Sequence, residues 1–395
     1  MTVLAPQTQA ELQQLVRQLH ADAAPWLPSG LGSRLDWGPQ VTAASEVLSI
    51  SKLGGIREHN PGDFTLTVAA GTPLHEVQAA LAEQRQWLSL DSPWGAADTS
   101  IGGLIARGLT GGYRQRAMGV RDQLLGLQLL RSDGVLARAG GKVVKNVAGY
   151  DLMRLLTGSW GALALITEVT LRTQPVPPQR RHVVVQDSLE DLGTLSRWLL
   201  GSSLSPERID LWSAPLASSA GQEPQPLLLL SLASIDATTL DEQIACIAER
   251  APHLRVADTA AAMALLDSAR GINSQSNAPE AEWLLRLAAP PTQATNLLGS
   301  PELKGIPVCL AAGSGIADGW AVASALPRHR VEALRRRCQE LGGYLTVLHQ
   351  PQPAAGSPLL PSWLDAPSRP LIEAVKRQFD PKQQLARGRL PGVAG

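Results

Sequence analysis

The stretch D-T-S-I-G-G-L-I-A-R-G-L-T-G-G, residues 98–112, holds five glycines in fifteen positions. Glycine lets a backbone come close to another group and adopt a positive φ, so successive amides can point at one anion. Two further glycine-rich stretches lie on either side of it, P-S-G-L-G-S-R at residues 28–34 and G-S-W-G-A-L-A-L-I-T at residues 158–167. Each alone is typical of an ordinary loop. Because all three lie in the first half of the chain, together they predict a pyrophosphate-binding site.

Two common phosphate-binding signatures do not explain these glycines. No G-x-G-x-x-G opens a helix after a strand, and neither G-K-S nor G-K-T occurs in the chain. The sequence therefore disfavours a Rossmann or Walker site.

Composition and charge exclude several classes of function. Lys and Arg total 35, as do Asp and Glu, so no excess charge favours nucleic acid or an anionic membrane. No apolar run approaches the roughly 20 residues that span a bilayer, which argues against direct membrane insertion. The three cysteines are far apart without C-x-x-C spacing, and the N-terminus lacks a signal-peptide apolar region. We expect a soluble cytoplasmic protein without a disulfide framework or metal–thiolate site.

The elements expected in the first part of the chain mix helices and strands. They are, in order, a helix after the capping box Thr8–Glu11, a turn-rich loop over 25–38, a strand over 63–70, a helix opening at Thr72, a hairpin over 124–138 and a strand over 163–171. Prolines at 175, 177 and 178 then mark a boundary, because proline cannot continue a β-ladder. The sequence predicts a first domain over residues 1–178.

The second part predicts helices packed on an antiparallel sheet, an α+β domain over residues 179–351. Its expected strands lie near 183–185, 209–212, 227–232, 283–287, 308–312 and 345–348, and its helices over 188–200, 238–249 and 330–341. Residues 352–370 are rich in Pro, Ser and Ala and predict a linker. Residues 371–395 are expected to form a last helix and a tail that return to the first domain.

A resemblance to a known family rests on one run and the motifs around it. Residues 140–152 read G-G-K-V-V-K-N-V-A-G-Y-D-L, V-R-D stands at 120–122, and G-S-W-G follows at 158–161. This order resembles the FAD-binding oxidases of the vanillyl-alcohol oxidase, or p-cresol methylhydroxylase, superfamily, and within it the FAD-binding E subunits of bacterial glycolate oxidase. The likeness covers residues 25–178, is weak from 180 to 370, and returns at F-D-P, residues 379–381, and at Gly388 and Arg389.

The resemblance implies a p-cresol methylhydroxylase-type FAD domain, built from two α+β subdomains, with a cap domain after it. It also implies a set of cofactor-binding residues. These are Gly30, Leu31, Gly32, Ser33 and Arg34 around the pyrophosphate; Thr99, Ser100, Gly102, Gly103, Thr110, Gly111 and Gly112 along the cofactor; Gly158, Ser159, Gly161 and Ile166 at the adenine and ribose side; and Lys145 and Asn146, where a loop-stabilising role is equally plausible. No catalytic residue is identified.

Departures from the family pattern shape the expected chemistry. No His or Cys occurs over 28–38, where some members tether flavin, so FAD should be bound non-covalently. The histidines of the expected cap are widely separated with no H-x-H, so no metal site is expected. The Asn-Pro-Gly usual after Asp-Pro is replaced by Ala386-Arg387-Gly388, which argues against a flavin contact from the tail.

The function implied is an FAD-binding redox subunit of a glycolate, or 2-hydroxy-acid, oxidase or dehydrogenase complex. Its expected partners are a homologous flavoprotein catalytic subunit and an iron–sulfur subunit, with a small 2-hydroxy acid as substrate and with membrane association only through those partners. Two alternatives stay open: a self-sufficient D-2-hydroxy-acid dehydrogenase acting on D-lactate or glycolate, and a non-redox assembly subunit that has lost the flavin.

Overall fold

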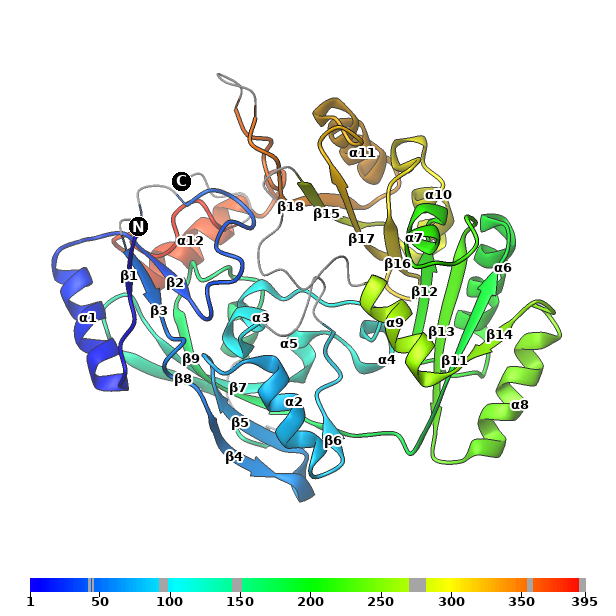
Figure 1. Ribbon diagram of the computed structural model, residues 1–395. Coiled ribbons are helices and arrows are strands. Elements are labelled where there is room, and N and C mark those ends of the chain that lie inside the picture. The colour runs from blue at the N-terminus through cyan, green and yellow to red at the C-terminus, as the bar shows by residue number, and fades with distance from the viewer. Residues whose placement is uncertain are drawn as a thin grey trace. The chain divides into compact units, whose positions relative to one another are not determined.

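The chain divides into two compact units, each described here by itself (Figure 1). The computed structural model describes residues 1–41, 44, 46–91, 99–143, 151–269, 282–353 and 358–390. The first unit comprises residues 1–109, 119–176 and 363–395, and the second comprises residues 110–118 and 177–362. Within the described ranges, no helix is both long enough and apolar enough to cross a bilayer.

The first unit is built around a five-stranded antiparallel sheet in the order β4-β5-β9-β7-β8. Its strands are β4 (Ile56–Asn60), β5 (Thr65–Ala69), β7 (Leu124–Leu130), β8 (Leu136–Gly140) and β9 (Leu165–Arg172). The expected strands over 63–70 and 163–171 and the hairpin over 124–138 are confirmed. The hairpin turns at Gly134, whose φ of +78° suits glycine and whose amide donates to the Arg131 carbonyl at 3.0 Å.

A smaller parallel sheet corrects one expectation from the sequence. It joins β1 (Thr2–Leu4), β3 (Glu46–Ser49) and β2 (Trp26–Ser29) in the order β1-β3-β2. A loop was expected throughout 25–38, yet residues 26–29 form β2. Trp26 and Leu27 are buried in the core, and pairing with β3 satisfies the backbone that this burial removes from water. Strands β6 (Gln86–Trp87) and β10 (Gln174–Pro175) form a separate antiparallel pair.

Helices complete the first unit. They are α1 (Gln9–Ala21), α2 (Leu74–Ala82), α3 (Ile101–Arg107), α5 (Val120–Gln123) and α12 (Arg369–Phe379), with 3₁₀ turns η1 (Pro61–Asp63) and η2 (Leu152–Leu156). The expected capping box is confirmed: the Thr8 hydroxyl accepts from the Glu11 amide at 3.1 Å, and the Glu11 carboxylate accepts from the Gln7 amide. Helix α12 packs on the same core through Ile372, Val375 and Phe379.

The second unit is an eight-stranded antiparallel sheet with helices, which confirms the expected α+β class. The strand order is β14-β11-β13-β12-β16-β17-β15-β18. Its strands are β11 (Gln179–Gln186), β12 (Arg208–Trp212), β13 (Leu227–Ser234), β14 (Arg255–Ala257), β15 (Glu282–Ala288), β16 (Val308–Ala311), β17 (Ile316–Val322) and β18 (Tyr344–His349). Its helices are α4 (Arg114–Ala117), α6 (Leu189–Gly201), α7 (Ala214–Ser219), α8 (Ala237–Ala248), α9 (Thr259–Ala269), α10 (Ala294–Leu298) and α11 (Arg328–Glu340), with η3 (Pro291–Gln293) and η4 (Pro301–Leu303).

Residues 110–118 belong to the second unit although they interrupt the sequence of the first. The Arg286 guanidinium donates to the Thr110 carbonyl, and the side-chain amide of Gln115 donates to the Pro206 carbonyl at 2.9 Å. The Arg208 guanidinium lies 4.6 Å from the centre of the Tyr113 ring, within cation–π distance. Polar and aromatic contacts therefore attach this segment to β15, to β12 and to Pro206 just before β12.

Candidate functional site

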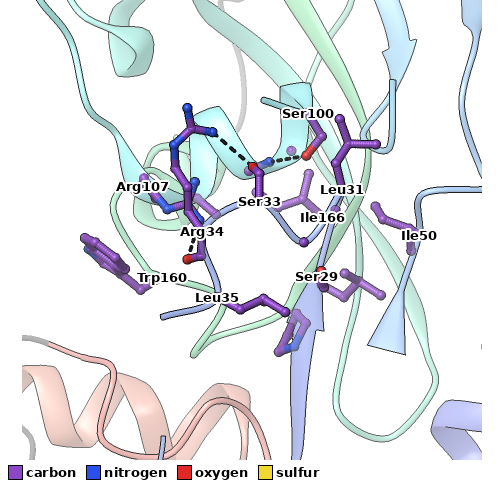
Figure 2. A pocket seen from close by; sticks show the side chains of 18 of the residues that line it. Ser29, Leu31, Ser33, Arg34, Leu35, Ile50, Ser100, Arg107, Trp160 and Ile166 are labelled. Carbon is purple, nitrogen blue, oxygen red and sulfur yellow. Dashed lines mark hydrogen bonds between the residues drawn. The ribbon is translucent and has the colours of Figure 1, made fainter. Parts of the chain in front are cut away.

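A pocket in the first unit brings the glycine-rich stretches together (Figure 2). Its unfilled space is about 690 Å³, counting the part open to solvent. Its walls are the end of β2 with the loop after it, helix α3, the segment before β9 with the start of β9, and a residue of the C-terminal tail. The lining residues are Pro28, Ser29, Gly30, Leu31, Gly32, Ser33, Arg34, Leu35, Ile50, Ser100, Gly102, Gly103, Ala106, Arg107, Trp160, Gly161, Ala164, Leu165, Ile166 and Arg389.

The loop after β2 packs directly against the start of α3. A Cβ added to Gly30 would lie 2.0 Å from the Ser100 hydroxyl oxygen, so no side chain fits there. That hydroxyl accepts from the Gly103 amide at 3.1 Å and caps α3. Gly32 has a φ of +78°, a backbone conformation that glycine adopts without strain. The loop can therefore present backbone, rather than side chains, along this wall.

The third glycine-rich stretch is fixed to α3 by its own backbone. The Gly158 amide donates to the Ile105 carbonyl at 3.1 Å, and the Trp160 amide donates to the Ala106 carbonyl at 2.8 Å. On its other side, a Cβ added to Gly161 would meet the Pro28 ring at 3.4 Å. Segments more than 120 residues apart in sequence thus form adjoining walls of one cavity.

Three arginines supply positive charge to these walls. The Arg34 guanidinium donates to the Thr99 hydroxyl at 2.7 Å and to the Ser33 hydroxyl at 3.0 Å, and Arg107 donates to the Arg34 carbonyl at 2.8 Å. Figure 2 shows Ser33, Arg34 and Arg107 gathered on one side of the pocket. The third arginine, Arg389, is buried and donates to the Leu35 carbonyl.

The pKa values of two of these arginines are lowered, mainly because of burial. Burial, followed by the nearby charges of Arg34 and Arg389, lowers the pKa of Arg107 to about 9, while Asp36 opposes that shift. Burial likewise lowers the pKa of Arg389 to about 10. Both guanidinium groups remain charged at neutral pH, but the protein alone disfavours that charged form. An anion in the pocket would stabilise both.

The pocket fits the chemical requirements of FAD. The diphosphate needs backbone donors and positive charge, which the loop after β2 and the three arginines provide. The flavin and adenine rings need apolar walls, which Leu31, Ile50, Ala164 and Ile166 supply. The steric constraint at Gly30 and the positive φ of Gly32 explain why the wall is made of glycine.

Most residues expected to contact the cofactor lie on or beside this pocket, although their contacts with FAD stay a prediction. Those that line it are Gly30, Leu31, Gly32, Ser33, Arg34, Ser100, Gly102, Gly103, Gly161 and Ile166. Thr99 accepts a hydrogen bond from Arg34, while Gly158 and Ser159 are not among the lining residues and are hydrogen-bonded to Ile105 and Leu156.

The remaining expected contacts are placed differently. Thr110, Gly111 and Gly112 lie in the second unit, where a Cβ on Gly112 would fall 2.3 Å from the Arg208 side chain and 2.5 Å from that of Asp210. The close packing against β12 accounts for the glycine at position 112. Lys145 and Asn146 fall outside the described residues.

Arg107, Trp160 and Arg389 are lining residues that the sequence reasoning did not single out. Arg107 and Trp160 stand inside the quoted glycine-rich stretches, where the argument rested on glycine alone. Arg389 was noted, but the altered tail motif argued against any contact. Arg389 lines the cavity, and the expectation that the tail makes no flavin contact stays a prediction.

Comparison with known proteins agrees with this geometry. The family model "FAD binding domain" matches residues 2–140. The chain is similar to glycolate oxidase subunit GlcE of Escherichia coli strain K12, with 35% identity over 189 residues, which is 47% of this chain and 53% of that protein. It is also similar to D-2-hydroxyglutarate dehydrogenase of Xanthomonas citri pv. viticola, with 34% identity over 49% of this chain and 41% of that protein. The chain thus spans about half the length of these curated relatives or less.

A solved structure extends the likeness of fold to nearly the whole chain. Alkyldihydroxyacetonephosphate synthase superposes with a TM-score of 0.69 at 14% identity, covering 97% of this chain and 75% of that one. The expected p-cresol methylhydroxylase-type fold is confirmed. The matched FAD domain contains the β2 loop and α3, which form two walls of the pocket. Residues 2–140 thus match an FAD-binding domain, and FAD is the cofactor of this chain.

Proposed function

We propose that this chain is the FAD-binding redox subunit of a glycolate-type 2-hydroxy-acid oxidase or dehydrogenase complex. The observation that carries the proposal is the pocket in which glycine backbone and three arginines converge. The relatives support the substrate class, since their names refer to glycolate oxidase and to a D-2-hydroxy-acid dehydrogenase. The location that goes with this proposal is the cytoplasm, with any membrane association made through partner subunits.

Different residues of the pocket would bind different parts of FAD. The amides of the loop at residues 30–34 would bind the diphosphate, with charge from Arg34 and Arg107. Ile166 and Trp160 would pack against the rings. When bound, FAD supplies the electron-transfer chemistry, and the protein sets its position and potential. None of the described residues that line the pocket is His or Cys, which supports the proposal of non-covalent binding.

We propose that a homologous flavoprotein subunit oxidises the substrate and that an iron–sulfur subunit receives electrons. The word "subunit" in the name of the Escherichia coli relative supports an assembly of several chains. Among the residues that the structure describes, no cluster of three or more His, Cys, Asp or Glu side chains is arranged to hold a metal ion. In this proposal the chain relays electrons through FAD beside a partner that oxidises the substrate.

The cofactor part of the proposal is tested on the purified chain. We expect a yellow protein with a flavin absorption spectrum, and acid precipitation should release all the flavin into the supernatant as FAD. A colourless protein that takes up no added FAD would favour the assembly-subunit alternative instead. Flavin left in the precipitate would contradict non-covalent attachment.

The redox part needs the chain with and without its partners. Glycolate and D-lactate are offered with a dye acceptor to the isolated chain and to the complex that co-purifies with it. We expect turnover only by the complex, and loss of that turnover when this chain is omitted. Turnover by the isolated chain would instead support the self-sufficient D-2-hydroxy-acid dehydrogenase, which the Xanthomonas citri relative favours.

A further inference from the structure

The C-terminal tail runs beside the strand that leads into the pocket. The Trp26 amide donates to the Gln384 carbonyl at 2.8 Å, and the Ala386 amide donates to the Trp26 carbonyl at 3.0 Å. These bonds place the tail beside β2, with a parallel bridge between Trp26 and Leu385. Strand β2 continues directly into the loop at residues 30–34. The same bonds therefore hold the tail next to this wall of the pocket.

A buried ion pair holds the tail in this course. The Lys376 ammonium donates to the Asp380 carboxylate at 2.6 Å and to the carbonyls of Ala162 and Leu385, both at 2.7 Å. The same carboxylate oxygen accepts from the Leu385 amide at 2.8 Å. Lys376 is 5% exposed and Asp380 is fully buried. The ion pair therefore joins α12 to the tail and to Ala162. Ala162 directly follows Gly161, a residue that lines the pocket.

Beyond this ion pair the tail places Arg389 in the pocket wall. The side chain is 5% exposed, and one of its terminal nitrogens donates to the Leu35 carbonyl. Its Nε is buried without a hydrogen-bond partner among the residues that the structure describes. A buried guanidinium with an unsatisfied nitrogen is unfavourable unless a ligand accepts a hydrogen bond from that nitrogen.

The charges near Arg389 point to the kind of ligand. Arg34 and Arg107 line the same pocket, and the charge of Arg389 helps to lower the pKa of Arg107. The carboxylate that opposes these shifts is Asp36, which is exposed to solvent and therefore screened. Three guanidinium groups lining one pocket favour a ligand with more than one negative charge, and FAD carries such charge only on its diphosphate.

We propose that Arg389, held in place by the Lys376–Asp380 pair, is a ligand of the FAD diphosphate. The proposal rests on the proposed function, because it requires that FAD occupy this pocket. A guanidinium suits the task since its planar group can donate two hydrogen bonds to phosphate oxygens at once. The tail would thus contribute a cofactor ligand from about 220 residues beyond the last of the glycine-rich stretches.

The test compares Arg389→Met and Arg389→Lys with the wild type. Apoprotein is titrated with FAD at low and high NaCl, and flavin fluorescence gives the dissociation constant. We expect Arg389→Met to weaken FAD binding roughly 10- to 100-fold, as the loss of one charged hydrogen-bonding group does. Its affinity should also depend less on NaCl than that of the wild type. Arg389→Lys should keep that salt dependence and lose less affinity.

Stability of the apoprotein separates a ligand from a merely structural residue. Because the protein alone disfavours the buried charge, apo Arg389→Met should unfold at the same temperature as the wild type or higher. Arg387→Gln is the matched control, since Arg387 is in the same tail but does not line the pocket. It should bind FAD as the wild type does.

The possible failures are distinguishable. If the wild type binds FAD and Arg389→Met binds it equally well, Arg389 is no ligand although the proposed function stands. A less stable apoprotein with unchanged salt dependence would likewise overturn the inference in favour of a packing role. If the wild-type apoprotein takes up no FAD, the proposed function itself fails, and with it this inference.

Discussion

At the scale of single residues, Gly32 offers a direct test of the pocket. Its φ is +78°, and an added Cβ would meet only Ser29 and Leu35 at 3.8 and 3.9 Å. Gly32→Val therefore introduces backbone strain of about 1–3 kcal/mol and a branched side chain at the pocket wall. We expect the purified variant to fold and to contain little or no FAD, measured as flavin absorbance per chain.

A matched control separates strain from blockage of the pocket. Gly55 lies in the same unit with a φ of +106°, and an added Cβ there has only the Arg57 side chain near it, at 3.9 Å. Gly55→Val should lose similar stability yet retain FAD. Equal flavin content in the two variants would show that the loop at residue 32 does not face the cofactor.

We expect His182 to make the stability of the second unit depend on pH. Its side chain is buried on β11, with Nδ1 3.0 Å from the Ser231 hydroxyl. Burial, with further effects of Arg180 and Arg208, lowers its pKa from 6.5 to about 4. The unfolded chain therefore binds a proton between pH 6.5 and 4 that the folded chain does not, and stability falls as pH falls through this window.

The expected size of that loss is about 3 kcal/mol across the whole window. His182→Gln removes the titrating group and should flatten the dependence of the unfolding midpoint on pH, measured by urea unfolding at several values between 7 and 4. His253→Gln is the control, because His253 is exposed. A wild-type dependence retained in His182→Gln would show that another group is responsible.

The sequence predicted the glycines of the site better than its arginines. A glycine forced by close packing, as at Gly30 against Ser100, stands out as a residue type that loops use for a few physical reasons. Arg107 and Arg389 could not be recognised in the same way, because most arginines in a sequence lie on solvated surfaces. Only the fold shows that Arg107 is half-buried and Arg389 buried in the pocket that Arg34 also lines.

At the scale of elements, helix α12 depends on its buried ion pair. Lys376→Met would leave the Asp380 carboxylate buried without its cation, which costs about 3–5 kcal/mol. We expect a correspondingly lower unfolding midpoint of the first unit in urea, followed by circular dichroism, with weaker FAD retention. Lys382→Met provides the comparison. Lys382 is exposed and donates to the His20 carbonyl, so its loss should change stability by about 1 kcal/mol or less.

Strong patterns predicted their elements, whereas weak ones did not. The apolar run of β13 and the capped helix α1 were found from the sequence because burial and capping leave clear signals. Strand β17 was missed because it reads I-A-D-G-W-A-V, and Asp and Gly are uncommon in strands. The Asp318 carboxylate pairs with the guanidinium of Arg286 on the adjacent strand β15, with a nitrogen–oxygen distance of 3.0 Å. Tertiary context thus overrode local preference.

At the scale of the whole molecule, the chain has two separate hydrophobic cores, one in each unit. We expect calorimetry of the apoprotein to show two unfolding transitions. If FAD occupies the pocket of the first unit alone, FAD at 100 times its dissociation constant should stabilise one transition by about 2.7 kcal/mol and leave the other in place. A single transition that shifts as a whole would show that the two cores unfold together.

The division of the chain was harder to predict than its fold class. Prolines near residue 177 mark where the second unit resumes, but nothing in residues 110–118 shows that they pack with β12 and β15. Their attachment depends on Arg208 and Arg286, which lie about 100 and 175 residues further along the chain. Contacts over such separations leave no periodic signal in a single sequence.

The place of Arg389 in the pocket wall has a consequence for how the protein is made. A ribosome completes the glycine loop, α3 and the whole second unit before it reaches the tail. The wall stays incomplete until residue 389 has emerged, so a nascent chain halted earlier would lack part of its cofactor cavity.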